Sequence, residues 1–180
     1  DRVKDVPRNA AVHHRDVDEL TAARVLAGQE CTENADDCHQ GAATDIRAAA
    51  LSATVFVVAY QDTADAGHGT AKVGTVSGTV ITFGAEAEFL SAGAAVYVSA
   101  AALSGMQFVV AYYDAADSGH GTARVGTVSG TVISFGAEAE FLSAGAAVFN
   151  SAAAIYADKF AVAYADYSDS GHGTVRVGTV

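Results

Sequence analysis

Two patterns of apolar positions along the chain both predict β-strands. Residues 108–113 are almost continuously apolar, as expected for a strand that is buried on both faces. Residues 131–141 instead alternate, with Ile133 and Phe135 on one face and Glu138 on the other, which predicts a half-exposed strand. Outward-pointing glutamates suit an edge strand, because charge discourages pairing with other chains.

The segments around these strands carry turn residues. Residues 114–121, Asp-Ala-Ala-Asp-Ser-Gly-His-Gly, predict a loop, and residues 122–128 predict a further strand. Ser129-Gly130 predicts the two-residue turn of a tight hairpin. The Ala- and Gly-rich residues 144–154 predict one more strand, whose small side chains suit a crowded position near an axis. We therefore expect the Ala/Gly-rich strand innermost and the Glu-bearing strand outermost.

This set of elements recurs along the chain. Residues 108–150 repeat residues 56–98 with seven differences, and a third copy runs from Phe160 to Val180. The period of about 52 residues is typical of propellers and other repeat arrays. The predicted fold class is therefore all-β, built from four-stranded antiparallel units.

Four antiparallel strands in a unit of this length resemble a β-propeller blade. The loop Ser168–Thr174 looks like the Asp-box turn of sialidase-like blades, although one extra residue separates the Gly from the Thr and the closing aromatic residue is absent. The loop is also similar to FG-GAP blades, without their full calcium loop. The resemblance covers the chain from about residue 40 and implies a propeller-like fold, incomplete or open; it carries structural rather than functional information.

The repeat predicts a β-domain over residues 40–180, with blades at about 40–90, 91–142 and 143–180. We expect the last blade to be incomplete within these residues, because the third copy stops before a counterpart of the Glu-bearing strand. Closed propellers have about four to eight blades. The open strand edges therefore need a cover, and a longer chain, the N-terminal segment and other copies of the chain are all candidates.

Residues 1–39 differ in kind from the repeats. We expect an extended arm over residues 1–14 and a short helix over residues 16–28. Asp16 suits the N-cap, Glu19 completes a capping box, and the glycine at the end suits a C-terminal stop. An alternative is a diverged repeat strand, because this segment loosely echoes the Thr-Ala-Arg-Val of the repeats.

The two cysteines of the chain, Cys31 and Cys38, lie in an acidic loop after the predicted helix. An isolated pair offers no second pair for a zinc site, so we expect a disulfide. The chain begins with Asp1 rather than Met, from which we expect removal of a leader. Both features favour a secreted or organelle-luminal protein in an oxidising compartment.

The formal net charge of −11 argues against nucleic-acid binding and against anionic membrane surfaces. It favours solubility or a cationic partner. Residues 89–113 lack charge and are long enough to span a bilayer, but their Ser and Gly content predicts two buried strands instead, so we expect no transmembrane segment.

The repeated loops hold the candidate ligand-binding residues. Three histidines and six aspartates recur at matching positions and are expected on one rim, where they are candidates to bind a cation or a sugar: Asp62, Asp65, His68, Asp114, Asp117, His120, Asp166, Asp169 and His172. The competing interpretation is turn chemistry, in which Asp bonds its own backbone and Gly supplies positive φ. Calcium needs six to eight oxygens, more than the two carboxylates of one loop.

Other polar and aromatic positions predict structural roles. Three tyrosines lie at matching strand ends: Tyr60, Tyr112 and Tyr164. We expect their rings to pack in the core and their hydroxyl groups to reach water. The alternative is a glycan site between blades, which would also use aromatic residues. The glutamates of the outer strands are expected to form a solvated edge: Glu86, Glu88, Glu138 and Glu140.

No nucleophile elbow, Walker loop or HExxH motif occurs, so we expect no enzyme. The favoured function is a non-catalytic protein-interaction or scaffold module, an accessory soluble subunit of a larger assembly. Its expected partner is a protein, or another copy, that pairs with an open strand edge. The alternative is a lectin-like module that binds carbohydrate or calcium through the Asp/His/Gly loops. We expect no cofactor, with calcium as the alternative.

Overall fold

The computed structural model describes His39 and residues 41–180. The predicted arm, the predicted helix over residues 16–28 and the predicted Cys31–Cys38 disulfide lie outside the described residues. The described part is all-β and antiparallel, which confirms this part of the prediction, although the two complete sheets have five strands rather than four.

Three successive units form three sheets. The first unit contains β1 (Ala43–Ala50), β2 (Val55–Asp62), β3 (His68–Ser77), β4 (Val80–Phe83) and β5 (Ala87–Leu90). The second contains β6 (Ala95–Ala102), β7 (Gln107–Asp114), β8 (His120–Ser129), β9 (Val132–Phe135) and β10 (Ala139–Leu142). The third contains β11 (Ala147–Tyr156), β12 (Lys159–Asp166), the single 3₁₀ turn η1 (Tyr167–Asp169) and β13 (His172–Thr179).

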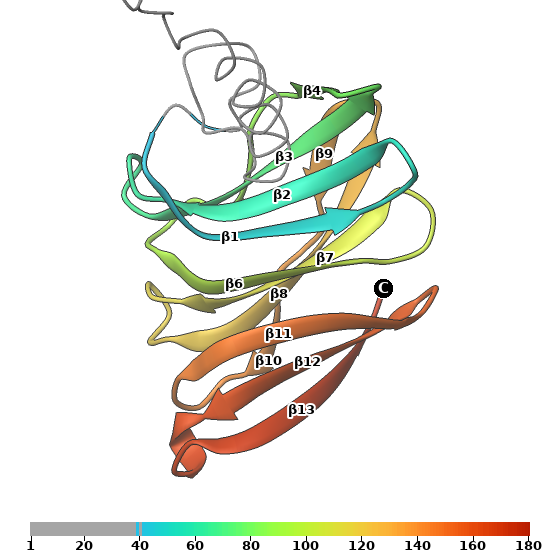
Figure 1. The fold of residues 1–180 in the computed structure, drawn as a ribbon. Coiled ribbons are helices and arrows are strands. Elements are labelled where there is room, and N and C mark those ends of the chain that lie inside the picture. Colours follow the sequence, from blue (N-terminus) through green and yellow to red (C-terminus); the bar gives the residue numbers. More distant parts are fainter. Residues whose placement is uncertain (1–38, 40) are drawn as a thin grey trace, which may run out of the picture.

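Each complete sheet has three long strands and two short ones on the same edge. β4 and β5 both pair with β3, and β9 and β10 both pair with β8. The third sheet has the order β11-β12-β13. None of the three sheets closes on itself, so the described residues form a stack of open sheets rather than a closed ring (Figure 1).

The single strand predicted over residues 131–141 is wrong, because a bulge divides it. Phe135 pairs with Gly126 and Ala139 pairs with Ala123, so three residues of the outer strand face two residues of β8. The extra residue reverses the faces: the ring of Phe135 contacts the core towards the first unit, whereas Phe141 contacts the core towards the third. A strict period of two holds only while the pairing is uninterrupted.

The hairpin predicted at Ser129-Gly130 is present but is shifted by one residue. Ser129 pairs with Val132, so the turn residues are Gly130 and Thr131. Gly130 has φ of 63°, which a glycine adopts without strain.

The sheets stack face to face, and the Ala-rich first strands β1, β6 and β11 lie next to one another (Figure 1). The middle sheet is covered on both faces: Phe108, Val110 and Tyr112 pack towards the first unit, and Val109 and Ala111 pack towards the third. Alternate residues of one strand therefore enter two cores, which explains the continuous apolar run of β7.

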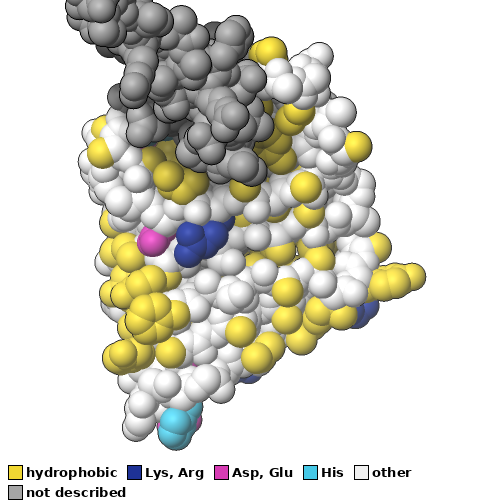
Figure 2. Space-filling view, viewed as in Figure 1, with side chains coloured by type: hydrophobic (Ala, Val, Ile, Leu, Met, Phe, Trp, Pro, Cys, Tyr) yellow, Lys and Arg dark blue, Asp and Glu magenta, His cyan; other side chains and the backbone are white. Residues whose placement is uncertain are grey.

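A second bulge occurs at the same place in the first strand of every unit. Its residue has positive φ in each case, at Asp45, Tyr97 and Phe149. The carboxylate of Asp45 accepts a hydrogen bond from the backbone N–H of Tyr97, and the rings of Tyr97 and Phe149 lie 5.1 Å apart. Hydrophobic side chains gather on this side of the molecule, at the left ends of β6 and β11 (Figure 2).

The uncharged stretch of residues 89–113 forms most of β6 and β7 with the turn between them, as predicted. Within the described residues, no helix has the length and apolar character needed to cross a membrane.

Candidate functional site

The repeated loops connect β2 to β3, β7 to β8 and β12 to β13, and all three lie at the same end of the stack, at the left of Figure 1. Hydrogen bonds attach the first two loops to the start of the next unit, from the N–H of Ala95 to the carbonyl of Gly67 and from the N–H of Ala147 to the carbonyl of Gly119. In the described residues, no ion pair joins the acidic and histidine side chains of one loop to those of another. The loops therefore form separate local sites rather than one shared centre.

The first aspartate of each loop holds the turn. Oδ1 of Asp62 accepts hydrogen bonds from the backbone N–H groups of Ala64 (2.9 Å) and Asp65 (3.1 Å). Asp114 does the same with the N–H groups of Ala116 and Asp117. Asp62 and Asp114 are almost fully buried. For these residues the structure agrees with the turn-chemistry interpretation.

The second aspartate and the histidine of each loop face each other across a tight turn. Ala66 and Gly67 both have positive φ, as in a type I′ turn, and the N–H of His68 donates to the carbonyl of Asp65. This geometry places Nδ1 of His68 3.2 Å from Oδ2 of Asp65. The corresponding distances in the other two loops are 3.2 Å at His120 and 3.1 Å at His172.

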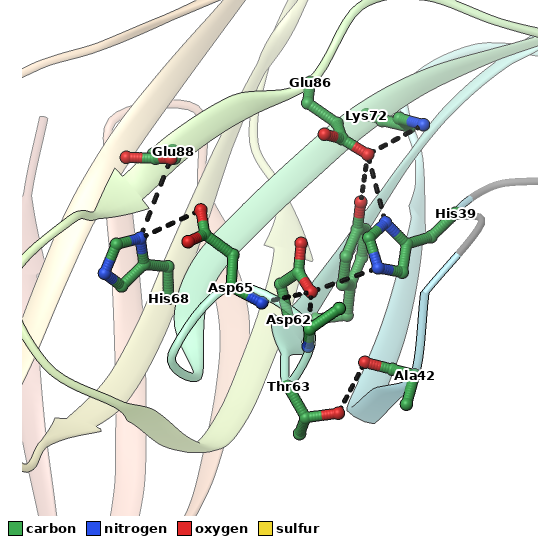
Figure 3. Close-up of polar contacts among 11 residues, drawn as sticks. His39, Ala42, Asp62, Thr63, Asp65, His68, Lys72, Glu86 and Glu88 are labelled. Atoms are coloured by element: carbon green, nitrogen blue, oxygen red, sulfur yellow. Dashed lines mark hydrogen bonds and ion pairs between the residues drawn. The ribbon is translucent and has the colours of Figure 1, made fainter.

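A glutamate from the outer strand joins this pair in the first two units. Glu88 pairs with Thr70, two residues after His68, so its carboxylate reaches to 3.7 Å from Nδ1 of His68 (Figure 3). Glu140 lies 3.6 Å from Nδ1 of His120 in the same way. Neither glutamate was predicted to belong to a site. Antiparallel pairing of the outer strand with the strand after the loop is the signal that would have identified them.

The other glutamate of the outer strand in the first unit belongs to a different network. Oε1 of Glu86 lies 3.0 Å from Nζ of Lys72 and 3.1 Å from Nδ1 of His39, and it accepts a hydrogen bond from the Tyr60 hydroxyl (Figure 3). Burial opposes ionisation of Glu86, but the hydrogen bonds from His39, Lys72 and Tyr60 and the Lys72 charge outweigh it, so the pKa of Glu86 is lowered. Nε2 of His39 lies 3.0 Å from Asp62.

Arg124 takes the place of Lys72 in the second unit. Its guanidinium donates twice to the carbonyl of Gly136 in the bulge, donates to the carbonyl of Phe89 in the first unit, and lies 3.5 Å from Glu138. The buried hydroxyl of Tyr112 contacts the same carboxylate and the same carbonyl. Burial, followed by the nearby Glu138 charge, raises the pKa of Tyr112 well above its ordinary value. The glutamates of the outer strands are exposed, as expected, but they also hold specific partners.

The three tyrosines predicted to lie in the core are buried, but only two of them have a partner for the hydroxyl from the outer strand. Tyr60 contacts Glu86 and Tyr112 contacts Glu138. Tyr164 is 4% exposed, and its hydroxyl has no hydrogen-bond partner in the described residues. The third unit has no strand in the position of β5 and β10 among the described residues, so no glutamate reaches Tyr164 or His172.

No family model matches the chain, and no curated protein matches it. The geometry of the described residues therefore carries the functional argument.

Proposed function

We propose that this chain is a non-catalytic protein-interaction module, a subunit of a larger assembly, whose third sheet takes up an outer strand supplied by a protein partner, by another copy or by a longer form of the chain. The observation that carries the proposal is the open edge of β13. In the described residues β13 pairs only with β12, whereas the equivalent strands β3 and β8 each have a second neighbour made of two short strands. A strand with unpaired N–H and C=O groups is a template for strand addition.

Side chains along and beside β13 also lack, within the described residues, the contacts that an outer strand makes in the complete units. In the second unit the ring of Phe141 lies so close to Gly121 that an added Cβ would be 2.3 Å from it. At the equivalent Gly173 the space is open, with nothing within 4 Å. Arg176 occupies the repeat position of Arg124 but makes no ion pair within the described residues. The hydroxyl of Tyr164 and the imidazole of His172 lack the glutamates that their counterparts contact.

These positions support a particular chemistry for the added strand. A strand with the pattern Glu-x-Glu-Phe, as in residues 138–141, would place one carboxylate near Arg176 and Tyr164, a second near His172, and an aromatic ring over Gly173. The partner is therefore expected to present an acidic strand with an aromatic residue. Main-chain pairing supplies affinity, and side-chain pockets supply specificity.

The outer face of the third sheet supports a partner that is larger than one strand. Val175 and Val177 are 62% and 63% exposed. Ala123, the counterpart of Val175, is 4% exposed because the third unit covers it, and Val125 packs against the same core. The repeat thus shows what covers this face elsewhere: another β-sheet of the same kind.

The alternative function is binding of calcium or carbohydrate by the loops. The first aspartate of each loop is engaged by the backbone, which leaves one loop carboxylate and one outer-strand glutamate near His68 and near His120, and one loop carboxylate near His172. That is far from the six to eight oxygen ligands of calcium. The observations therefore favour the interaction module.

A peptide with the sequence of residues 131–142 tests the proposal, because it is the outer strand of the second unit offered to the third. We expect a fluorescently labelled peptide to bind the purified chain with a stoichiometry of one. Replacement of its Glu140 by Pro, which removes a backbone donor, should abolish binding. On the protein, Gly173→Ala should weaken binding about tenfold or more by filling the space for the ring.

Matched changes on a different surface provide the control. Gly136 has no close neighbour except a backbone oxygen at 3.6 Å, so Gly136→Ala should leave peptide affinity unchanged. Equal binding of the parent and proline peptides would contradict strand addition, as would equal affinity of the wild-type chain and Gly173→Ala.

A further inference from the structure

Two groups of three side chains recur with nearly identical geometry, one in the first unit and one in the second. The first group is Asp65, His68 and Glu88, and the second is Asp117, His120 and Glu140. In each group the nitrogen and oxygen ligand atoms all lie within 4.8 Å of one another. The distances from Nδ1 to the two carboxylates are 3.2 and 3.7 Å in the first group and 3.2 and 3.6 Å in the second.

The ring nitrogen at the centre of each group is enclosed but unsatisfied. Nδ1 of His68 and Nδ1 of His120 have no contact with solvent and make no hydrogen bond in the described residues. The carboxylates are close enough for an ion pair, but neither contact has the geometry of a hydrogen bond. A buried polar atom of this kind calls for an explanation, and an ion is one of the standard ones. Figure 3 shows Asp65 and Glu88 directed at the same nitrogen of His68 from the loop and from β5.

The donor set and the spacing suit a small divalent transition-metal ion. Zinc is bound by His nitrogen and carboxylate oxygen at about 2.0 to 2.2 Å, so neighbouring ligands of a tetrahedral site are about 3.3 to 3.6 Å apart. The nitrogen–oxygen distances of both groups lie close to that range. The carboxylates are about half exposed, which leaves a fourth position open to water.

A third group, formed by His39, Asp62 and Glu86, differs in which ring nitrogens its carboxylates contact. Its carboxylates contact different ring nitrogens, Nε2 and Nδ1, so the short contacts do not converge on one nitrogen as they do in the first two groups. Both carboxylates also hold other partners: backbone N–H groups for Asp62 and Lys72 for Glu86. This group is an ion-pair network rather than a metal site.

The third unit supplies an internal comparison. His172 and Asp169 keep the 3.1 Å contact, but both side chains are 69% exposed and no glutamate reaches them in the described residues. Two ligands on an exposed loop make a weaker site than three.

We propose that Asp65, His68 and Glu88 bind one divalent ion of the zinc type, and that Asp117, His120 and Glu140 bind a second. Each ion would connect a loop to the outer strand of the same sheet. The sites belong to the complete units, so they are independent of strand addition at the third.

Calorimetric titration with Zn²⁺ tests the proposal on the full chain with Cys31 and Cys38 reduced and alkylated, so that thiolates do not contribute. The variant Glu88→Gln/Glu140→Gln should bind two fewer equivalents than the wild type, and each single variant should bind one fewer. Gln keeps the size of these exposed side chains while removing the anionic ligand. His172→Gln is the matched control and should retain both equivalents.

NMR spectra of the histidine rings give a second measurement on the wild-type chain, independent of how the glutamate variants fold. The ring signals of His68 and His120 should shift in step with the first two equivalents of Zn²⁺. Equal zinc stoichiometry in the wild type and the double variant would overturn the proposal, and so would ring signals of His68 and His120 that do not respond to zinc.

Discussion

Each complete unit contains glycines whose missing side chain is replaced by an aromatic ring. The ring of Phe108 covers Gly126 on the neighbouring strand, and an added Cβ there would lie 2.3 Å from the ring. Gly121 lies under Phe141 in the same way. Glycine inside a strand normally weakens it, and a ring from the neighbouring strand restores the lost packing.

The repeat offers a matched test of this packing. Gly121→Ala forces Phe141 to move, and we expect it to lower the free energy of unfolding by about 1 to 3 kcal/mol. Gly173→Ala changes the same repeat position where no atom lies within 4 Å, so we expect a change within about 0.5 kcal/mol. Urea denaturation of both variants gives the comparison. Equal losses of stability in Gly121→Ala and Gly173→Ala would show that the backbone conformation, and not contact with the Phe141 ring, requires glycine at this repeat position.

Asn150 is the one polar substitution at a buried position of the second copy. Its counterpart Val98 is fully buried in the core, whereas Asn150 is 7% exposed and its side-chain amide has no hydrogen-bond partner in the described residues. A buried amide without partners costs about 1 to 3 kcal/mol.

We therefore expect Asn150→Val to raise the free energy of unfolding by about 1 to 3 kcal/mol. The reverse change, Val98→Asn, should destabilise the chain by a similar amount. Thermal denaturation of the two variants against the wild type would test both. A loss of stability in Asn150→Val would show that the amide holds a partner.

At the scale of elements, the alternation of apolar residues predicted the strands well but could not locate the bulge. The pattern from Ile133 to Phe141 continues without interruption, although pairing with β8 shifts between Phe135 and Ala139. The cause is tertiary: the N–H of Gly136 donates to the carbonyl of Val125, and Arg124 binds the carbonyl of Gly136. No local pattern encodes those contacts.

The sequence predicted the loop residues of the candidate site but not the glutamates that approach from the outer strand. The Asp-x-x-Asp-x-Gly-His-Gly pattern indicated both the turn and the residues of the rim, because turn chemistry acts between near neighbours. Glu88 and Glu140 were missed as ligand candidates, because their approach depends on the pairing of β5 and β10 with the preceding long strands.

The network around Glu86 predicts a pH dependence. Because its folded-state pKa lies below the ordinary value of 4.5, ionised Glu86 stabilises the fold above the unfolded-state pKa. That contribution is lost as pH falls through the folded-state pKa. The carboxylate is 44% exposed, so the effect should stay below about 1 kcal/mol.

We expect the wild type to be more stable than Glu86→Gln at neutral pH, and the difference to shrink as pH falls from 5 towards 3. Urea denaturation across this range measures it, and a double-mutant cycle with Lys72→Gln isolates the ion pair. A difference that stays constant with pH would show that Glu86 acts through its shape rather than its charge.

At the scale of the whole molecule, the three sheets are equivalent in sequence but not in environment. The middle sheet is covered on both faces, whereas within residues 41–180 the third presents apolar residues of β13 and a strand edge without a neighbour. The repeat makes this comparison possible, because the covered units show which contacts the third unit lacks. The central claim is that an added outer strand supplies them.

Amide hydrogen exchange along β13 tests this claim most directly. In the purified chain at low concentration, we expect residues 174–180 to exchange faster than the equivalent residues 122–128 of β8, which have neighbours on both sides. Addition of the peptide with the sequence of residues 131–142 should slow exchange in residues 174–180 and leave residues 122–128 unchanged. Strong protection of residues 174–180 in a monomer without peptide, or no change when peptide is added, would contradict the account.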